Sequence, residues 1–403
     1  MHATSNLSRA ILYGIIYASG LYYVEILRDL ETSRSLAAWV GSTIIASMSV
    51  ASVLSSALTN KYGSRLTCAF GSMIASFGLI VSVFSTSIFY LFVSYGLITG
   101  VGLGISLIPN VVSVNDYFNK WRHIAQSIAS SGSSFGMFVG PIVMERLISH
   151  YGWRGSLLIC SALVLNLGVL GLLHRPFHEQ NKLPLMCVQG STVDVKVMNW
   201  SIFKDKRFLC ICLASSFVSF ATSIIMIHLA AFARLDAGIP AQQAALLLSV
   251  IGIMGVPMRL VYGALLSKNL SAYAVILIAS LAIGFTTAVL PFITYYPGLI
   301  IYSLVTGIFM SASGGAVWPA LLTDLLGESN LSNSIGCMNF ACALGNLSGP
   351  PVAGKKNRVR AGGITRAVGI ARAGGIARAC GTTRAGGITK AGGIARAGGA
   401  TML

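Results

Sequence analysis

The stretch that decides the fold runs from Tyr117 to Pro141 and reads YFNKWRHIAQSIASSGSSFGMFVGP. It begins with a short charged turn and continues into an apolar segment. In this segment and in the apolar segment before it, glycine recurs at every fourth position, at Gly96, Gly100, Gly104, Gly132, Gly136 and Gly140. This spacing places the glycines on one helix face, where a neighbouring backbone can approach closely. The pattern predicts two adjacent membrane spans that pack tightly together.

The composition indicates a polytopic membrane protein. Of the 403 residues, 55% are hydrophobic and only 10% are charged, and the mean hydropathy is +0.76. A soluble domain has about a quarter of its residues charged. The eight cysteines are mostly scattered through apolar segments, which predicts neither a disulfide framework nor a zinc site. We therefore expect an all-α membrane fold without metal or cofactor.

Eleven apolar segments approach the roughly 20 residues that cross a bilayer. They lie at 10–27, 37–59, 66–84, 88–114, 124–147, 153–174, 207–233, 242–266, 271–292, 297–322 and 331–354. The last is the weakest, since it is rich in Asn, Ser and Gly. The predicted domains are an amino-terminal bundle at 1–174, a cytosolic linker at 175–206 and a carboxy-terminal bundle at 207–354. A basic tail follows at 355–403.

The orientation follows from the basic residues of the short loops. With a cytosolic amino terminus, the inner loops carry eleven Lys and Arg residues and the outer loops five. This bias places the linker in the cytosol.

The two predicted bundles resemble each other. Tyr95, Thr99 and Gly100 recur as Tyr302, Thr306 and Gly307, displaced by 207 residues, and IAQSI at 124–128 recurs as LSNSI at 331–335 with the same displacement. Parallel repeats of this kind are typical of two-bundle transporters. Chance similarity between apolar segments is the alternative.

Several motifs, in the right order, resemble the major facilitator superfamily and, more narrowly, the monocarboxylate transporters. They are NKYGSR at 60–65, YFNKWRHIA at 117–125, YGWRGSLLI at 151–159, DLLG at 324–327 and GPPVAG at 349–354. The resemblance implies two six-helix bundles, so the first helix would be incomplete and the twelfth missing. It also implies a plasma-membrane location and a single-span ancillary protein as partner.

The departures from the family pattern concern its coupling residues. The acidic, Gly- and Trp-rich signature that opens the first span is absent. Tyr17 stands about where proton-coupled members carry a lysine, and Gly255 stands where they carry an aspartate, four residues before Arg259. These changes fit members that carry other organic solutes better than a proton-coupled lactate transporter.

Three residues are candidates for substrate binding: Arg259, Gln126 and Tyr17. A buried arginine costs about 2.5–3.5 kcal/mol or more, so Arg259 should face the bundle interior, where its planar fork of donors matches a carboxylate. The alternative is that it snorkels to the cytosolic surface. Gln126 lies one turn after Arg122 and is expected either to donate to a solute oxygen or to stabilise the loop.

Five polar residues form a candidate gate and loop motif on the cytosolic side, where ion pairs could break and re-form as the bundles rock. They are Lys61, Arg65, Asp116, Lys120 and Arg122. Simple orientation of the loops is the alternative.

The tail repeats a six-residue unit with a basic residue in every sixth position, as in AGGITR at 361–366. It has too little bulk for a core, so we expect it to be disordered. One interpretation is that the tail is a translated tandem nucleotide repeat, which implies no nucleic-acid partner. The alternative is a basic arm that binds acidic lipid or RNA.

Two classes of function remain. The first is a secondary transporter of a small organic solute, a monocarboxylate or related organic anion, that works by alternating access within the lipid bilayer. The second is a transport-incompetent sensor, scaffold or truncated isoform that keeps the fold. No catalytic constellation is present in the sequence, and we expect no enzyme.

Overall fold

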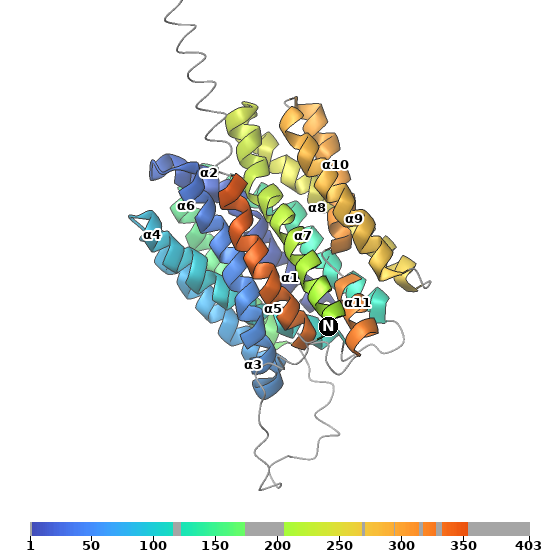
Figure 1. Ribbon diagram of the computed structural model, residues 1–403. Helices are drawn as coiled ribbons and strands as arrows, with labels where there is room; N and C mark the ends of the chain where they lie inside the picture. Colours follow the sequence, from blue (N-terminus) through green and yellow to red (C-terminus); the bar gives the residue numbers. More distant parts are fainter. Residues whose placement is uncertain are drawn as a thin grey trace, which may run out of the picture. The chain divides into compact units, whose positions relative to one another are not determined.

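The computed structural model describes residues 2–115, 122–173, 205–267, 271–293, 295–313, 317–327 and 333–353. These residues form helices and short connections, with no strand among them, which confirms the predicted all-α fold (Figure 1). The chain divides into a compact unit, Met1–Gly354, and a second unit, Lys355–Leu403. The tail, most of the linker, Asp116 and Lys120 lie outside the described residues.

The first half of the compact unit is built from long helices. They are α1 (His2–Tyr17), α2 (Ser19–Asp29), α3 (Arg34–Val83), α4 (Ile88–Leu91), the π-helix η1 (Phe92–Thr99), α5 (Gly100–Asn115) and α6 (Arg122–Leu172). The first span, α1 with α2, begins earlier than the predicted boundary at residue 10. Arg9 therefore belongs to the helix.

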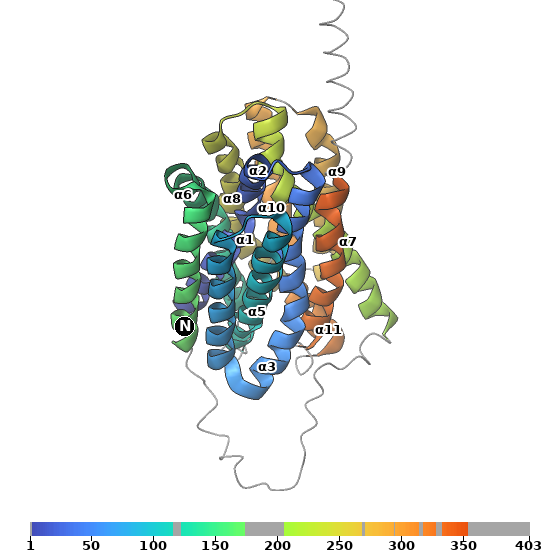
Figure 2. The ribbon, with the colours of Figure 1, turned by 90° about the vertical axis from the view of Figure 1, so that its left-hand side faces the viewer.

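The second half contains shorter helices. They are α7 (Lys206–Ala231), η3 (Phe232–Asp236), α8 (Ala241–Ser267), α9 (Ala272–Val289), η4 (Leu290–Phe292), α10 (Tyr296–Ser313), α11 (Val317–Leu326) and a final helix at 333–353. This final helix packs against α7, where Ser216 Oγ donates to the Ala341 carbonyl oxygen at 2.8 Å. It also reaches α3, where Asn346 Nδ2 donates to Ser49 Oγ at 3.2 Å. Figure 2 shows this helix beside α7.

Two glycines divide the longest helices into separate spans. Gly63 has φ 81° inside α3, and Gly152 has φ 69° inside α6. A residue with a side chain is strained in this left-handed region, whereas glycine adopts it readily. Each glycine therefore ends one span and lets the chain return as the next.

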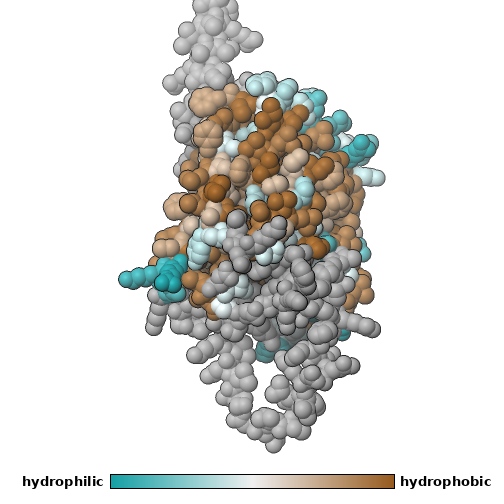
Figure 3. All heavy atoms as spheres, turned by 90° about the vertical axis from the view of Figure 1, so that its right-hand side faces the viewer, coloured by the Kyte–Doolittle hydropathy of each residue, from teal (hydrophilic) through white to brown (hydrophobic). Residues whose placement is uncertain are grey.

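In the described part of the chain, nine helices are long and apolar enough to cross a membrane. One of them, Gln126–Leu172, has 47 residues and contains two predicted segments joined at Gly152. The final helix is not among the nine, although residues 333–353 are helical. All eleven predicted segments thus coincide with helices. Figure 3 shows a face dominated by hydrophobic side chains, as contact with lipid requires.

The two glycine ridges do not pack against each other, so this prediction was wrong. A side chain at Gly132, Gly136 or Gly140 of α6 would meet the backbone of α1 at Asn6, Ala10 or Gly14. The ridge of Gly96, Gly100 and Gly104 faces α3 instead, at Thr43, Ser47 and Met48. Each ridge allows close approach to a helix distant in sequence, because consecutive spans need not be the tightest neighbours in a bundle.

The packing of the two halves repeats with the displacement seen in the sequence. A side chain at Gly100 would meet the Ile44 carbonyl oxygen and Ser47, and one at Gly307 would meet the Ile251 carbonyl oxygen and Met254. All three pairs of positions differ by 207. The same helix–helix contact therefore occurs in both halves, which makes chance similarity an inadequate explanation of the repeat.

Candidate functional site

A cavity of about 210 Å³ lies between the two halves. Its walls come from α1, α3 and α5 of the first half, and from α7, α8, α10, α11 and the final helix of the second. The polar and aromatic side chains that line it are Tyr13, Tyr17, Ser49, Ser215, Ser219, Thr222, Ser223, Arg259, Trp318, Asn339 and Asn346. Because both halves contribute, any motion of one half against the other changes this cavity.

Among the described residues that line the cavity, Arg259 is the one that carries a charge. Its side chain is only 6% exposed, so it does not snorkel to the surface. The guanidinium is held on α6, where one terminal nitrogen, Nη1, donates to the Ser130 carbonyl oxygen at 2.7 Å and to Ser133 Oγ at 2.5 Å. Its Nε is buried without a hydrogen-bond partner, and in the described part of the chain no carboxylate pairs with it. A positive charge therefore remains available for an anion.

Tyr17 lines the same cavity, together with Tyr13, one turn earlier on α1. Their rings stack with centroids 5.6 Å apart and an interplanar angle of 29°. Both tyrosines line the cavity together with Arg259. The structure thus brings two of the three predicted binding residues, Arg259 and Tyr17, to one site, with an aromatic wall beside a cation.

Gln126 is not brought to this site. It is 4% exposed on α6, its Oε1 has no hydrogen-bond partner, and it does not line the cavity. Gln126 and Arg122 lie about one turn apart on α6, but helix spacing alone does not indicate which helix faces the cavity.

The predicted cytosolic gate is described only in part. Lys61 and Arg65 flank the break at Gly63, and the Lys61 ammonium lies 5.1 Å from the Tyr62 ring centroid. Asp116 and Lys120 lie outside the described residues, and the Arg122 side chain is not described.

Ion pairs do join the halves, at the opposite end of the bundle, where α2 ends and α3 begins. Arg234 contacts Glu25 at 2.9 Å, and Arg34 contacts Asp236 at 3.3 Å. The Tyr23 ring meets the His228 ring edge-on, with centroids 5.5 Å apart, and His228 Nε2 donates to the Pro350 carbonyl oxygen at 2.8 Å. The sequence gives little signal for these pairs, because their partners lie about 200 positions apart.

The sequence also did not identify Arg9 as a candidate site residue. This arginine is 4% exposed, and its Nη2 donates to the Asn110 carbonyl oxygen on α5 at 3.0 Å. The first apolar segment was predicted to begin at residue 10, so Arg9 lay just outside it. The available signal was the spacing of four that places Arg9, Tyr13 and Tyr17 on one helix face.

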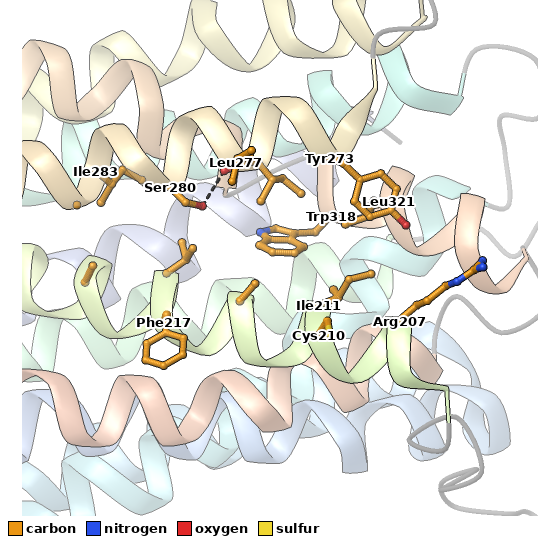
Figure 4. A pocket seen from close by; sticks show the side chains of 15 residues that line it. Arg207, Cys210, Ile211, Phe217, Tyr273, Leu277, Ser280, Ile283, Trp318 and Leu321 are labelled. Atoms are coloured by element: carbon orange, nitrogen blue, oxygen red, sulfur yellow. Dashed lines mark hydrogen bonds between the residues drawn. The ribbon is translucent and has the colours of Figure 1, made fainter.

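A larger hollow of about 780 Å³ lies on α7, α9 and α11, away from these charges. Its wall is apolar, formed by residues such as Phe217, Leu277 and Trp318, with Arg207 and Tyr273 near one end (Figure 4). Arg207 is the one charged residue among the described lining residues of this hollow, and it is exposed, whereas Arg259 is buried. We therefore take the smaller cavity as the candidate solute site.

Comparison with known proteins agrees with this architecture. Residues 6–353 match the family model of the Major Facilitator Superfamily. Monocarboxylate transporter 4 of Mus musculus is 29% identical over 353 residues, which cover 85% of this chain and 73% of the relative. Monocarboxylate transporter 12-B of Danio rerio is 30% identical over 362 residues, covering 83% of this chain and 76% of the relative.

Human monocarboxylate transporter 12 is also similar, at 29% identity over 364 residues, covering 83% of this chain and 70% of the relative. The matches extend through both halves and across the cavity between them. This chain is a multi-pass membrane protein that belongs to the major facilitator superfamily of transporters, in the family of the monocarboxylate transporters.

Proposed function

We propose that this transporter carries a small organic anion, a monocarboxylate or a related solute, by alternating access between its two halves. The observation that carries the proposal is Arg259. A guanidinium this deeply buried is costly unless an anion or acid compensates it, and no carboxylate pairs with it in the described part of the chain. Arg259 also lines a cavity of solute size.

The rest of the cavity suits the remainder of such a solute. Tyr13 and Tyr17 offer an aromatic surface, and Trp318 lines the wall contributed by α11. Hydroxyl and amide side chains, including Ser215, Thr222 and Asn339, supply hydrogen bonds for polar substituents. Ligand sites commonly combine apolar walls with a few placed polar groups. We place Tyr17 and Arg259 in the binding site, and we assign Gln126 to the inner end of the path.

The ion pairs between the halves support a rocking mechanism. Glu25–Arg234 and Arg34–Asp236 join the halves at one end. The side chains of Arg34 and Asp236 are 29% and 36% exposed, so this pair contributes little stability and can break at low cost when the halves separate. Arg234 and Glu25 are more buried, at 11% and 23%. We propose that Lys61, Arg65, Asp116, Lys120 and Arg122 act at the other end.

Uptake into proteoliposomes tests the transport proposal. We expect saturable entry of labelled butyrate, absent from protein-free liposomes, and no competition by the neutral amide butyramide, which lacks the charge that Arg259 would bind. Competition by butyramide equal to that by unlabelled butyrate would contradict anion recognition. Binding without uptake would favour the sensor or scaffold alternative.

We also propose a plasma-membrane location, bundles at 1–174 and 207–354, a cytosolic linker at 175–206, a disordered tail at 355–403 and a single-span ancillary partner. The topology predicts that Gly190→Cys, in a chain whose eight native cysteines are replaced by Ser, reacts in intact cells with a membrane-permeant maleimide but not with an impermeant one. Ser149→Cys, which is exposed near the Gly152 break, is the matched control and should react with both. Labelling of residue 190 by the impermeant reagent would overturn the orientation.

A further inference from the structure

We propose that Arg9 forms a second anion-binding position beside the central cavity, so that the site prefers solutes with two carboxylates. The inference rests on the proposed function, because it extends the anion site of Arg259. It goes further by assigning a role to a residue outside the cavity lining and by naming dicarboxylates as the preferred class.

Arg9 is buried, and its guanidinium is incompletely satisfied. The side chain is 4% exposed, and its Nε has no hydrogen-bond partner. Its Nη2 donates to the Asn110 carbonyl oxygen at 3.0 Å, an acceptor shared with Ser5 Oγ at 3.1 Å. A backbone carbonyl carries only a partial charge, so this contact does not neutralise the arginine. An unsatisfied charged donor at membrane depth is unfavourable without a ligand.

The position of Arg9 connects it to the solute cavity. It lies four residues before Tyr13, and a helix rises 1.5 Å per residue, so the two are about 6 Å apart along α1 and on the same face. On α5, Leu107 lines the cavity, and Asn110 follows one turn later. The guanidinium, bonded to Asn110, therefore lies about one helical turn beyond the cavity wall on both helices.

The two buried arginines are electrostatically coupled. Arg9 and Arg259 are both positively charged and repel each other. Within the described residues, neither arginine pairs with a carboxylate. One positive charge thus lines the cavity and a second lies about one helical turn beyond it, and a monocarboxylate compensates only one. A solute with two carboxylates, one near Arg259 and the other toward Arg9, compensates both.

Ligand binding to the purified full chain tests this proposal. Butyrate and succinate share a four-carbon skeleton and differ in one carboxylate. Their dissociation constants follow from the concentration dependence of thermal stabilisation, since a ligand that binds the folded state raises its melting temperature. We expect succinate to bind more tightly than butyrate. Arg9→Gln should raise the dissociation constant for succinate about tenfold, which corresponds to ~1.4 kcal/mol. The same substitution should change the dissociation constant for butyrate less than about twofold.

Two further variants sharpen the experiment. Arg9→Lys keeps the charge and should retain part of the preference for succinate. Arg146→Gln removes an exposed arginine far from the cavity and should change neither constant.

The outcomes separate this inference from the proposed function. Two outcomes would overturn the dicarboxylate assignment alone, provided that butyrate binding still depends on Arg259. In the first, Arg9→Gln weakens the binding of both acids equally. In the second, the unmodified protein shows no preference for succinate. If neither acid binds, the anion-transport proposal fails as well. The preference of the unmodified protein decides the matter even where Arg9→Gln does not fold.

Discussion

Arg259→Lys is expected to lower anion uptake at least about tenfold while the protein still reaches the membrane. Lysine keeps the positive charge but loses the planar fork that can bind a carboxylate through two parallel hydrogen bonds. Hydrogen bonds to charged groups contribute about 1.5–3 kcal/mol, and each 1.4 kcal/mol is a factor of ten in affinity. Arg259→Ala removes the charge as well and should lower uptake further.

The measurement is initial uptake rate, divided by the amount of protein at the cell surface. Because Arg259 also bonds Ser130 and Ser133 on α6, a loss of surface protein would indicate a structural role instead. Ser133→Ala is a useful companion, since it removes one of these anchors and keeps the guanidinium. Unchanged uptake in both the lysine and the alanine variant would show that the arginine does not bind the solute.

Gly136→Leu is expected to abolish folded protein. The first carbon of any side chain at this position would collide with the Ala10 backbone on α1. Overpacking costs typically about 1–3 kcal/mol and more where backbone has to move, and a protein has only about 5–15 kcal/mol of stability to lose. Fluorescence-detected size exclusion of a tagged chain in detergent reports the fraction that stays monodisperse.

Gly284→Leu is the matched control. Gly284 also lies inside a helix, but nothing comes within 4 Å of an added side-chain carbon there. Both substitutions improve helix propensity by similar amounts, so the difference between them isolates the close approach of α1 and α6. Equal elution profiles for the two variants would show that the glycine ridge of α6 is not required for packing.

The sequence predicted the helices well because the bilayer imposes the length and polarity of each span. All eleven predicted segments are helical, including the weak one at 331–354, whose described residues are 333–353. The sequence could not predict which helix each glycine ridge contacts, because a small residue permits close approach without specifying the partner. The position of α1 against α6 depends on the whole bundle.

The site was predictable where the burial of a single charged residue in an apolar segment costs much free energy. Arg259 stood out as a charge inside an apolar segment, and the structure places it in the cavity wall. Arg9 did not stand out, because it follows other polar residues and the helix boundary was set too late. Glu25–Arg234 could not be inferred, since opposite charges are common at helix ends and only the three-dimensional arrangement pairs them.

The repeated packing at Gly100 and Gly307 bears on how this protein arose. Arg259 lies on the same helix as Ile251 and Met254, and the position 207 residues before it is Ser52. Ser52 is fully buried, and its Oγ donates to the Ser49 carbonyl oxygen of its own helix at 2.7 Å. Duplication of one ancestral segment would account for the helix–helix contact that the two halves share. The guanidinium that we assign to solute binding is present in one half and is replaced by Ser52 at the equivalent position of the other.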